Sequence, residues 1–217
     1  MWILTPEGVY QSELLNSLVW VRHGFGTRNA DGWPGEYTQL KQVHSDAIFI
    51  ADTVDGCLGK GDALITSAPN RWVGIRTADC VPVLLAGPDK RIVAAVHAGW
   101  RGTIREIVAT TVARMESEFG TEPGNLRAAI GPCINRCCYE VGPEVSEQFD
   151  RLFPERHDLT RIDLPEANRR QLVAAGVPPA QIDVSDLCTA CDADQFHSYR
   201  RDKDLAGRMV AAIQIAG

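Results

Sequence analysis

The stretch Val93-Ala94-Ala95-Val96-His97-Ala98-Gly99-Trp100-Arg101-Gly102-Thr103 carries the clearest structural signal in the sequence. Its apolar part, which starts at residue 92, predicts a buried strand that ends on a histidine. The glycines that follow predict a turn, and a helix is expected directly after it. His97 and Arg101 therefore lie between the carboxyl end of a strand and a helix N-terminus, a place where anions and metal ions bind.

The helix after this turn is expected to begin at Thr103. Thr103 and Glu106 have the spacing of a capping box, and apolar residues recur with a helical period from Ile104 to Phe119. Gly120 has the position of a C′ glycine and is expected to end the helix.

The rest of the chain mixes short strands and helices without strict alternation. This mixture favours an α+β fold with layered, mixed sheets over a doubly wound parallel sheet. The patterns predict strands over 18–21, 47–51, 62–65, 73–76, 81–86, 126–130, 182–184 and 209–215, and short helices over 145–153 and 167–175.

Length and composition favour one core. The chain has 217 residues, of which 45% are hydrophobic, so we expect a single domain over residues 1–217. The net charge of −6 and the lack of a basic block argue against a nucleic-acid partner. No apolar run reaches the roughly 20 residues that span a bilayer, so no membrane association is expected. Seven cysteines, an odd number without a visible export signal, favour reduced thiols and a cytoplasmic location.

Two imidazoles and one thiol stand near predicted strand ends. His44, Cys80 and His97 form a three-ligand set for zinc that leaves one coordination position open for water or substrate. The same residues also allow a Cys80–His97 dyad, with the cysteine as nucleophile and the histidine as base. These two interpretations conflict, because a thiolate bound to zinc is a poor nucleophile. The spacing alone also allows three unrelated core residues.

Acidic and basic residues accompany these ligands. Asp62 and Asp79 can orient a ligand histidine, act as a general acid or base, or bind turn amides. Arg101 is a candidate anion contact because it precedes a helix N-terminus. The neighbouring Arg200 and Arg201 can hold a phosphate, whereas most arginines in this group are expected to be solvated. The group consists of Arg76, Arg101, Arg127, Arg136, Arg200 and Arg201.

A C-x-x-C motif is formed by Cys188 and Cys191. Such a motif is half of a zinc ribbon or a redox pair, but no second C-x-x-C stands at ribbon spacing. Cys137 and Cys138 are adjacent, so they are not expected to chelate in the usual way. Buried free thiols are the expected state of Cys188 and Cys191.

Six motifs occur in an order that is typical of one protein family. They are K-Q-V-H-S (41–45), G-D-A-L-I-T (61–66), T-A-D-C-V-P-V-L (77–84), V-H-A-G-W-R-G (96–102), A-I-G-P-C-I (129–134) and F-H-S-Y-R-R-D (196–202). Together they closely resemble the YfiH family, also called the polyphenol oxidase or laccase-domain family and known as purine nucleoside phosphorylases. The resemblance runs from about Gly24 to the C-terminus.

The resemblance implies a layered α/β/β/α sandwich, similar to the catalytic domain of cytotoxic necrotizing factor. It implies zinc on His44, Cys80 and His97. The implied activities are phosphorolysis of adenosine, inosine, guanosine and methylthioadenosine, with adenosine deamination, so purine nucleosides and phosphate are the expected partners. Copper-dependent oxidation of phenols is an older attribution of the family.

This sequence departs from the family pattern in two places. The segment between Arg28 and Val43 is shorter than usual, so a helix that helps to wall the pocket is expected to be missing. His197 replaces a phenylalanine and adds an imidazole near the expected site.

Zinc-dependent purine nucleoside phosphorolysis is the leading hypothesis, with Arg101 as phosphate contact and Asp62 or Asp79 as proton donor to the purine. A cysteine hydrolase or deamidase that uses Cys80 and His97 is the first alternative. A copper oxidoreductase is disfavoured, because five histidines are too few for a multicopper cluster, although copper can replace zinc in one site. A binding module with a degenerate site is the non-enzymatic alternative.

Overall fold

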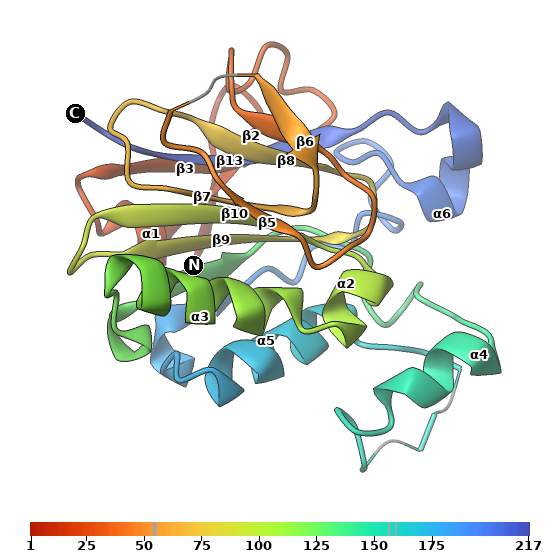
Figure 1. Ribbon diagram of the computed structural model, residues 1–217. Helices are drawn as coiled ribbons and strands as arrows, with labels where there is room; N and C mark the ends of the chain where they lie inside the picture. Colours follow the sequence, from red (N-terminus) through yellow and green to blue (C-terminus); the bar gives the residue numbers. More distant parts are fainter. Residues whose placement is uncertain (54–55, 156, 159) are drawn as a thin grey trace.

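Two stacked β-sheets form the centre of the molecule in the computed structural model, which describes residues 1–217 except 54–55, 156 and 159 (Figure 1). In the five-stranded sheet every neighbouring pair is antiparallel. Its order is β1 (Trp2–Leu4), β2 (Val9–Ser12), β3 (Val21–Gly26), β13 (Met209–Ile215) and β8 (Val73–Thr77).

The six-stranded sheet is mixed. Its outer pairs β11–β12 and β5–β7 are parallel, and its inner pairs are antiparallel. Its order is β12 (Ile182–Val184), β11 (Arg127–Ile130), β9 (Val81–Gly87), β10 (Ile92–Ala98), β7 (Ala63–Thr66) and β5 (Ile48–Ile50), and β4 (Gln39–Lys41) and β6 (Cys57–Lys60) form a separate parallel pair.

Two helices cover the six-stranded sheet on the face away from the other sheet (Figure 1). They are α3 (Ile107–Phe119) and α5 (Leu164–Ala174). The shorter elements are α1 (Glu13–Asn16), α2 (Trp100–Ile104), α4 (Pro143–Ser146), α6 (Tyr199–Asp202) and the 3₁₀ turns Pro123–Asn125, Glu147–Phe149, Pro179–Gln181 and Lys203–Leu205. No helix in the described part of the chain is both long enough and apolar enough to cross a membrane.

The apolar run of β10 follows from its place between two cores. Val93 and Ala95 face the core between the sheets, whereas Ala94 and Val96 face the core under the helices. A strand that is buried on both faces shows no polar alternation, so the sequence reads as a continuous apolar run. The predicted strand is confirmed.

The outer helical layer expected over the five-stranded sheet is not formed by the described residues. An aromatic loop covers that face instead, with the Trp33 side chain packed over Gly24 and Gly26 and the Tyr37 ring over Gly74. This loop belongs to the shortened segment after Arg28, which is too short and too rich in glycine to provide a long helix. The mixed α+β class is confirmed, with three main layers in place of four, and the likeness to the toxin domain stays a prediction.

The capping box predicted at Thr103 is wrong. Gly99 precedes α2, and Glu106 adopts a left-handed conformation with φ 59° that separates α2 from α3. The Thr103 hydroxyl accepts a hydrogen bond from Asn168 Nδ2 at 3.1 Å, and Glu106 pairs with Arg151. Both capping side chains are therefore engaged elsewhere. Gly120 ends α3 with φ 70°, as predicted.

Two other predicted boundaries shift. Residues 18–20 form a turn closed by the Val21 N–H donating to the Leu18 carbonyl at 2.9 Å, so the first predicted strand is wrong and β3 begins at Val21. The helix predicted over 145–153 begins at Pro143 and continues only as a 3₁₀ turn to Phe149.

Candidate metal and substrate site

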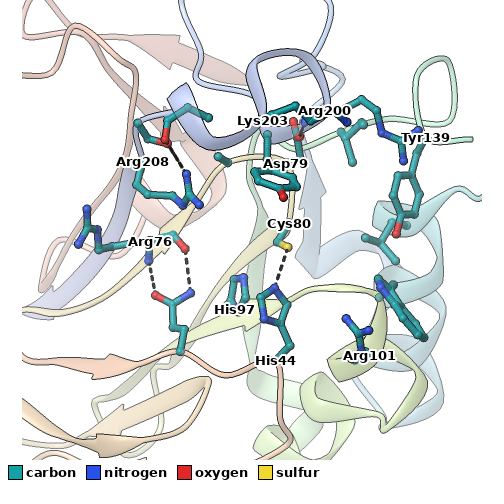
Figure 2. Close-up of a pocket in the computed structure, with 18 of the residues that line it drawn as sticks. His44, Arg76, Asp79, Cys80, His97, Arg101, Tyr139, Arg200, Lys203 and Arg208 are labelled. Atoms are coloured by element: carbon teal, nitrogen blue, oxygen red, sulfur yellow. Dashed lines mark hydrogen bonds between the residues drawn. The ribbon is translucent and has the colours of Figure 1, made fainter. Parts of the chain in front are cut away.

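The β9–β10 hairpin places Cys80 and His97 at the same end of the six-stranded sheet. His97 pairs with Pro82 and Ala98 with Val81, so the residue before β9 lies beside the end of β10. His44 reaches the same point from the loop after β4, where its φ is 58°. A nitrogen of each histidine and the cysteine sulfur lie within 4.8 Å of one another (Figure 2). The structure thus brings the three predicted ligands together, and we call them the His–Cys–His site.

Glycine at position 99 permits this convergence. A Cβ atom there would lie 2.9 Å from His44 Cδ2 and 3.1 Å from Cys80 Sγ. Any larger residue would push one of these two ligands away.

Asp62 holds the site from behind. Its carboxylate accepts a hydrogen bond from His97 at Nδ1 (2.8 Å), from the His44 N–H (3.0 Å) and from the Ser45 N–H (2.6 Å). Because Nδ1 of His97 is occupied, Nε2 is the nitrogen left for a metal ion. Asp62 is fully buried and does not line the pocket. Through these contacts the Asp62 carboxylate orients His97 and fixes the loop that carries His44.

The electrostatics of these groups are coupled. Burial would raise the pKa of Cys80, but the imidazoles of His97 and His44 lower it to about 6. Burial would lower the pKa of His97, but Cys80 and Asp62 raise it to about 9. Burial likewise opposes ionisation of Asp62, yet His97 and Ser45 lower its pKa to about 2. The thiol is therefore prepared to ionise near neutral pH, as a metal ligand must.

The donor set can hold a metal ion. Two imidazole nitrogens and one thiolate suit zinc or copper, and three protein ligands leave a position that faces the pocket. Cys80 Sγ lies 3.9 Å from His44 Nε2, and the centres of the two imidazole rings are 5.0 Å apart.

A pocket of about 1030 Å³ opens in front of this site. Cationic side chains surround it on several sides (Figure 2). Arg101 lies over the Trp100 ring at 4.3 Å, and Arg200 lies 5.5 Å from the Tyr139 ring. Such a concentration of positive charge attracts anions despite the net negative charge of the chain. The cationic lining residues are Lys41, Arg76, Arg101, Arg200, Lys203 and Arg208.

Asp79 anchors the C-terminal wall of the pocket. It adopts φ 89°, and its carboxylate accepts hydrogen bonds from the Thr189 hydroxyl (2.7 Å), the Ser198 hydroxyl (3.1 Å) and the Arg200 N–H (2.6 Å). These bonds tie the start of α6 to the strand end that carries Cys80. Asp79 lines the pocket, but its two oxygens are already engaged by these three donors.

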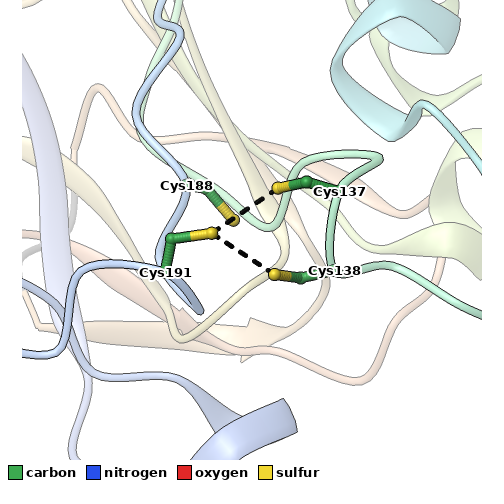
Figure 3. Close-up of side chains that lie close together, drawn as sticks. All are labelled: Cys137, Cys138, Cys188 and Cys191. Atoms are coloured by element: carbon green, nitrogen blue, oxygen red, sulfur yellow. Dashed lines mark hydrogen bonds between the residues drawn. The ribbon is translucent and has the colours of Figure 1, made fainter.

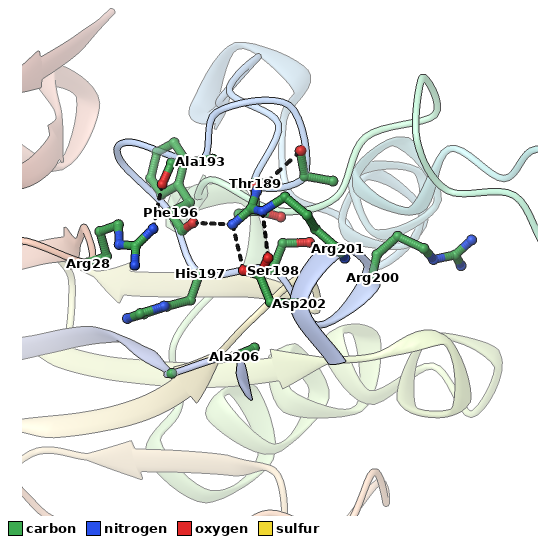
Figure 4. Close-up of polar contacts among 12 residues, drawn as sticks. Arg28, Thr189, Ala193, Phe196, His197, Ser198, Arg200, Arg201, Asp202 and Ala206 are labelled. Carbon is green, nitrogen blue, oxygen red and sulfur yellow. Dashed lines mark hydrogen bonds and ion pairs between the residues drawn. The ribbon is translucent and has the colours of Figure 1, made fainter. Parts of the chain in front are cut away.

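Arg201 and His197 do not line the pocket. The Arg201 guanidinium donates to the carbonyls of Thr189 and Phe196 and pairs with Asp202, so it is committed to the folding of its own segment (Figure 4). Its predicted phosphate role is wrong, because no free face remains. The His197 ring packs against Gly207 and is not part of the His–Cys–His site.

Of the other five arginines in the group, two lie away from the site as expected and three line the pocket. Arg127 bonds the Leu14 carbonyl at 3.5 Å and Arg136 pairs with Asp158 at 3.7 Å, both away from the site. Tyr139, Lys203 and Arg208 are among the pocket residues that were not predicted. Tyr139 follows the C-C pair, whereas Lys203 and Arg208 follow the F-H-S-Y-R-R-D motif, so proximity to motifs was the only signal in the sequence.

Comparison with known proteins extends these observations. A purine nucleoside phosphorylase of Bacteroides thetaiotaomicron is 44% identical over 163 residues, which cover 71% of this chain but only 60% of that protein. Adenosine deaminase RL5, from an unknown prokaryotic organism, is 39% identical over 80% of this chain and 72% of that protein. The crystal structure of the Bacillus licheniformis hypothetical protein YfiH aligns with a TM-score of 0.89 at 29% identity, covering 99% of this chain and 98% of that one. Residues 27–216 match the family described as multi-copper polyphenol oxidoreductase laccase. The chain therefore belongs to this laccase-like family, the YfiH family that its motifs resemble.

Proposed function

We propose that this protein is a zinc-dependent purine nucleoside phosphorylase, acting on adenosine, inosine, guanosine or methylthioadenosine. The observation that carries the proposal is the position of an open three-ligand site at the base of a cationic pocket. A relative of 44% identity is named as such an enzyme. Zinc on His44, Cys80 and His97 would retain a formal charge of about +1 and supply Lewis-acid polarisation of a bound oxygen.

Phosphate is bound by the arginines of the pocket. Arg101 is the main candidate, with Arg76 and Arg200 as further contacts, because guanidinium groups bind phosphate oxygens with paired hydrogen bonds. In phosphorolysis a phosphate oxygen forms a bond to C1′ of the ribose while the C1′–N9 bond breaks. The purine leaves with a proton at N7, and the products are a free base and ribose 1-phosphate.

Tyr139 is the donor that the geometry favours for this proton. The low pKa of Asp62 and its place behind His97 assign it to positioning, and the Asp79 oxygens are occupied. The Tyr139 phenol lines the pocket, and burial raises its pKa, so it keeps its proton at neutral pH and can donate a hydrogen bond to N7.

Adenosine deamination is a second reaction proposed for the same pocket. A relative of 39% identity is named adenosine deaminase. In this reaction water adds at C6 of the purine and ammonia leaves, so the site must bind the base near the His–Cys–His site rather than the ribose.

The test is an assay of purified protein with adenosine, with and without inorganic phosphate. Adenine and ribose 1-phosphate that appear only with phosphate support phosphorolysis, whereas inosine and ammonia in both reactions support deamination. If His97→Ala forms the same products at the same rate, or if the wild type forms none, the proposal is wrong.

Two other chemistries are separated by metal analysis. The lowered pKa of Cys80 beside His44 and His97 also suits a thiolate nucleophile in a metal-free cysteine hydrolase. That alternative predicts activity without metal, and loss of activity when Cys80 is alkylated. Copper-dependent phenol oxidation predicts oxygen consumption with phenols, by protein that contains copper rather than zinc.

A further inference from the structure

Two distant segments bring four cysteine thiols together, away from the pocket lining (Figure 3). Cys191 Sγ lies 3.4 Å from Cys138 Sγ and 3.6 Å from Cys137 Sγ. These distances are too long for a disulfide, which needs about 2.05 Å. All four sulfurs lie within 4.8 Å of one another. We call this group the four-cysteine cluster; its members are Cys137, Cys138, Cys188 and Cys191.

These separations match those of a tetrahedral thiolate site. With metal–sulfur bonds of about 2.3 Å, neighbouring sulfurs in a tetrahedral zinc site lie about 3.8 Å apart. The two closest contacts of Cys191 fall within a few tenths of an ångström of that value. Four uncharged thiols gain little from such an arrangement, because S–H is a weak donor. A soft metal ion accounts for the convergence better than hydrogen bonding does.

Two turns create the arrangement. The Cys138 N–H donates to the Asn135 carbonyl at 3.0 Å, and the Cys191 N–H donates to the Cys188 carbonyl at 3.2 Å. The turn at Asn135 directly precedes the adjacent pair, and the side chains of Cys137 and Cys138 both point toward Cys191 (Figure 3). This geometry argues against the expectation that the pair does not chelate. Cys191 is exposed, so its expected burial is wrong as well.

Polar groups around the cluster suit a thiolate. The Asn135 N–H donates to Cys188 Sγ at 3.4 Å, which is a bond that stabilises a ligating sulfur. The Arg201 guanidinium, which pairs with Asp202, donates to the Thr189 and Ala190 carbonyls at 3.0 and 3.2 Å and so holds the loop between Cys188 and Cys191 in place.

We propose that the four-cysteine cluster binds a second metal ion, a structural zinc that is separate from the His–Cys–His site. Four thiolates fill a tetrahedral zinc, so no position remains for substrate and the site is closed. On binding, each ligating thiol loses its proton to solvent and no redox step is required.

The second zinc would fix one wall of the pocket. Cys138 directly precedes Tyr139, and the hydroxyl of Thr189, inside the C-x-x-C motif, donates to Asp79 at 2.7 Å. A metal ion that joins the two turns therefore holds two groups in fixed positions: the Tyr139 phenol and the Thr189 hydroxyl that donates to Asp79. This inference does not depend on the proposed reaction, because it concerns metal content.

The test is zinc stoichiometry of the full-length protein by elemental mass spectrometry. We expect about two zinc ions per wild-type chain, about one in Cys188→Ser/Cys191→Ser and about one in His44→Ala/His97→Ala. Cys57→Ser is the matched control, because Cys57 is exposed and lies outside the cluster, and it should retain both ions.

X-ray absorption of zinc-loaded His44→Ala/His97→Ala protein tests the same site without altering the cluster. Four sulfur neighbours at about 2.3 Å are expected. The proposal is overturned if the wild type holds a single zinc that the histidine substitutions remove. A Cys138–Cys191 disulfide in anaerobically purified protein, or iron with inorganic sulfide in place of zinc, would also overturn it. If wild-type protein holds both zinc ions but does not turn over adenosine, the proposed function is wrong and the proposal of a second zinc site still stands.

Discussion

The His–Cys–His site and the four-cysteine cluster differ in how their ligands are held. His97 comes from a fully paired strand and Cys80 directly precedes one, and the buried Asp62 orients His97 from behind. The four cysteines come from two turns that are joined by a few backbone hydrogen bonds and the bridge between Cys133 and Cys188. We therefore expect the strand ends to keep the His–Cys–His site in place without a metal ion, and the two turns to be held together more firmly when a metal ion is bound.

The two groups also differ in what surrounds them. The His–Cys–His site opens into a cationic pocket, and its ligands leave a free position. The four-cysteine cluster offers four sulfur ligands, which is enough to complete a tetrahedral site. Metal at the first site is therefore expected to control the reaction rate, and metal at the second to control the shape of the pocket wall. The predictions below test this division in order of decreasing effect on turnover.

His97→Gln is expected to have the largest effect. It removes a ligand and the partner of Asp62, so adenosine turnover should fall by at least about a thousandfold, which corresponds to the several kcal/mol that a metal ion supplies to a transition state. Zinc content should fall from about two ions to about one per chain. Steady-state kinetics and metal analysis on one preparation measure both. If the variant keeps full turnover with a single remaining zinc, the reaction does not take place at the His–Cys–His site.

Arg101→Gln tests the cationic pocket, which accompanies only the first site. Loss of a hydrogen bond between charged groups costs about 2 kcal/mol, so KM for phosphate should rise by about thirtyfold while both zinc ions stay bound. Arg105→Gln is the matched control, because Arg105 is exposed, ends the same short helix and does not line the pocket. Equal effects of the two substitutions would show that the position of Arg101 has no special role.

Asp62→Asn separates positioning from ligation. An amide nitrogen in place of Oδ2 would oppose the Ser45 N–H, which lies 2.6 Å away, and would loosen the loop of His44. Zinc affinity at the first site should fall by about 10- to 100-fold, as for other partners of ligating histidines, with the second zinc unaffected. Excess zinc should restore turnover. Failure of zinc to rescue the variant would give Asp62 a direct part in the chemistry.

Removal of the second zinc is expected to have a moderate effect. In Cys188→Ser/Cys191→Ser the two turns separate and Tyr139 loses its fixed position, so kcat/KM should fall by about tenfold, less than for loss of a ligand at the reacting centre. Thermal unfolding should lose the zinc response of the second site, which stabilises the wild type by about 2.7 kcal/mol at a free zinc concentration of 100 times the Kd of that site, and should keep the response of the His–Cys–His site. Turnover equal to the wild type would mean that the pocket wall is rigid without this metal.

The two sites also differ in how well the sequence predicts them. His44, Cys80 and His97 stand near strand ends that hydrophobic patterning identifies, so their convergence follows from the hairpin and from motif order. The four-cysteine cluster depends on how two turns pack against each other, and no short spacing encodes that. Adjacent cysteines such as Cys137 and Cys138 are not expected to chelate from their spacing alone. The directions of their side chains are set by the turn at Asn135, which the spacing does not reveal.

Predictions from local sequence patterns are wrong where the side chains make tertiary contacts instead. Thr103 and Glu106 have capping-box spacing, yet Thr103 bonds Asn168 and Glu106 pairs with Arg151. Arg201 likewise looks like a phosphate ligand, but backbone carbonyls of its own segment occupy it. The motif places Asp62 near the site, but its five hydrogen bonds to four different residues follow only from the fold.

His23→Gln should leave turnover unchanged at neutral pH and separates loss of fold from loss of metal in acid. Burial lowers the pKa of His23 from its usual 6.5 to about 4, and its Nε2 accepts the Ser12 N–H at 3.0 Å. The unfolded chain therefore binds a proton below about pH 6.5 that the folded chain refuses until about pH 4, so stability falls as the pH drops through this window. Between pH 7 and pH 4.5 this difference is worth about 2 kcal/mol.

Glutamine keeps an acceptor for the Ser12 N–H but does not titrate, so urea unfolding of the variant should lose about 2 kcal/mol less than the wild type over that range. The exposed His157→Gln is the control and should leave the profile unchanged. Because the variant stays folded to a lower pH, any zinc that it still loses on acidification is lost through protonation of the ligands themselves. The two metal sites can then be compared down to a lower pH. A variant that loses stability as steeply as the wild type would place the acid sensitivity in another buried group.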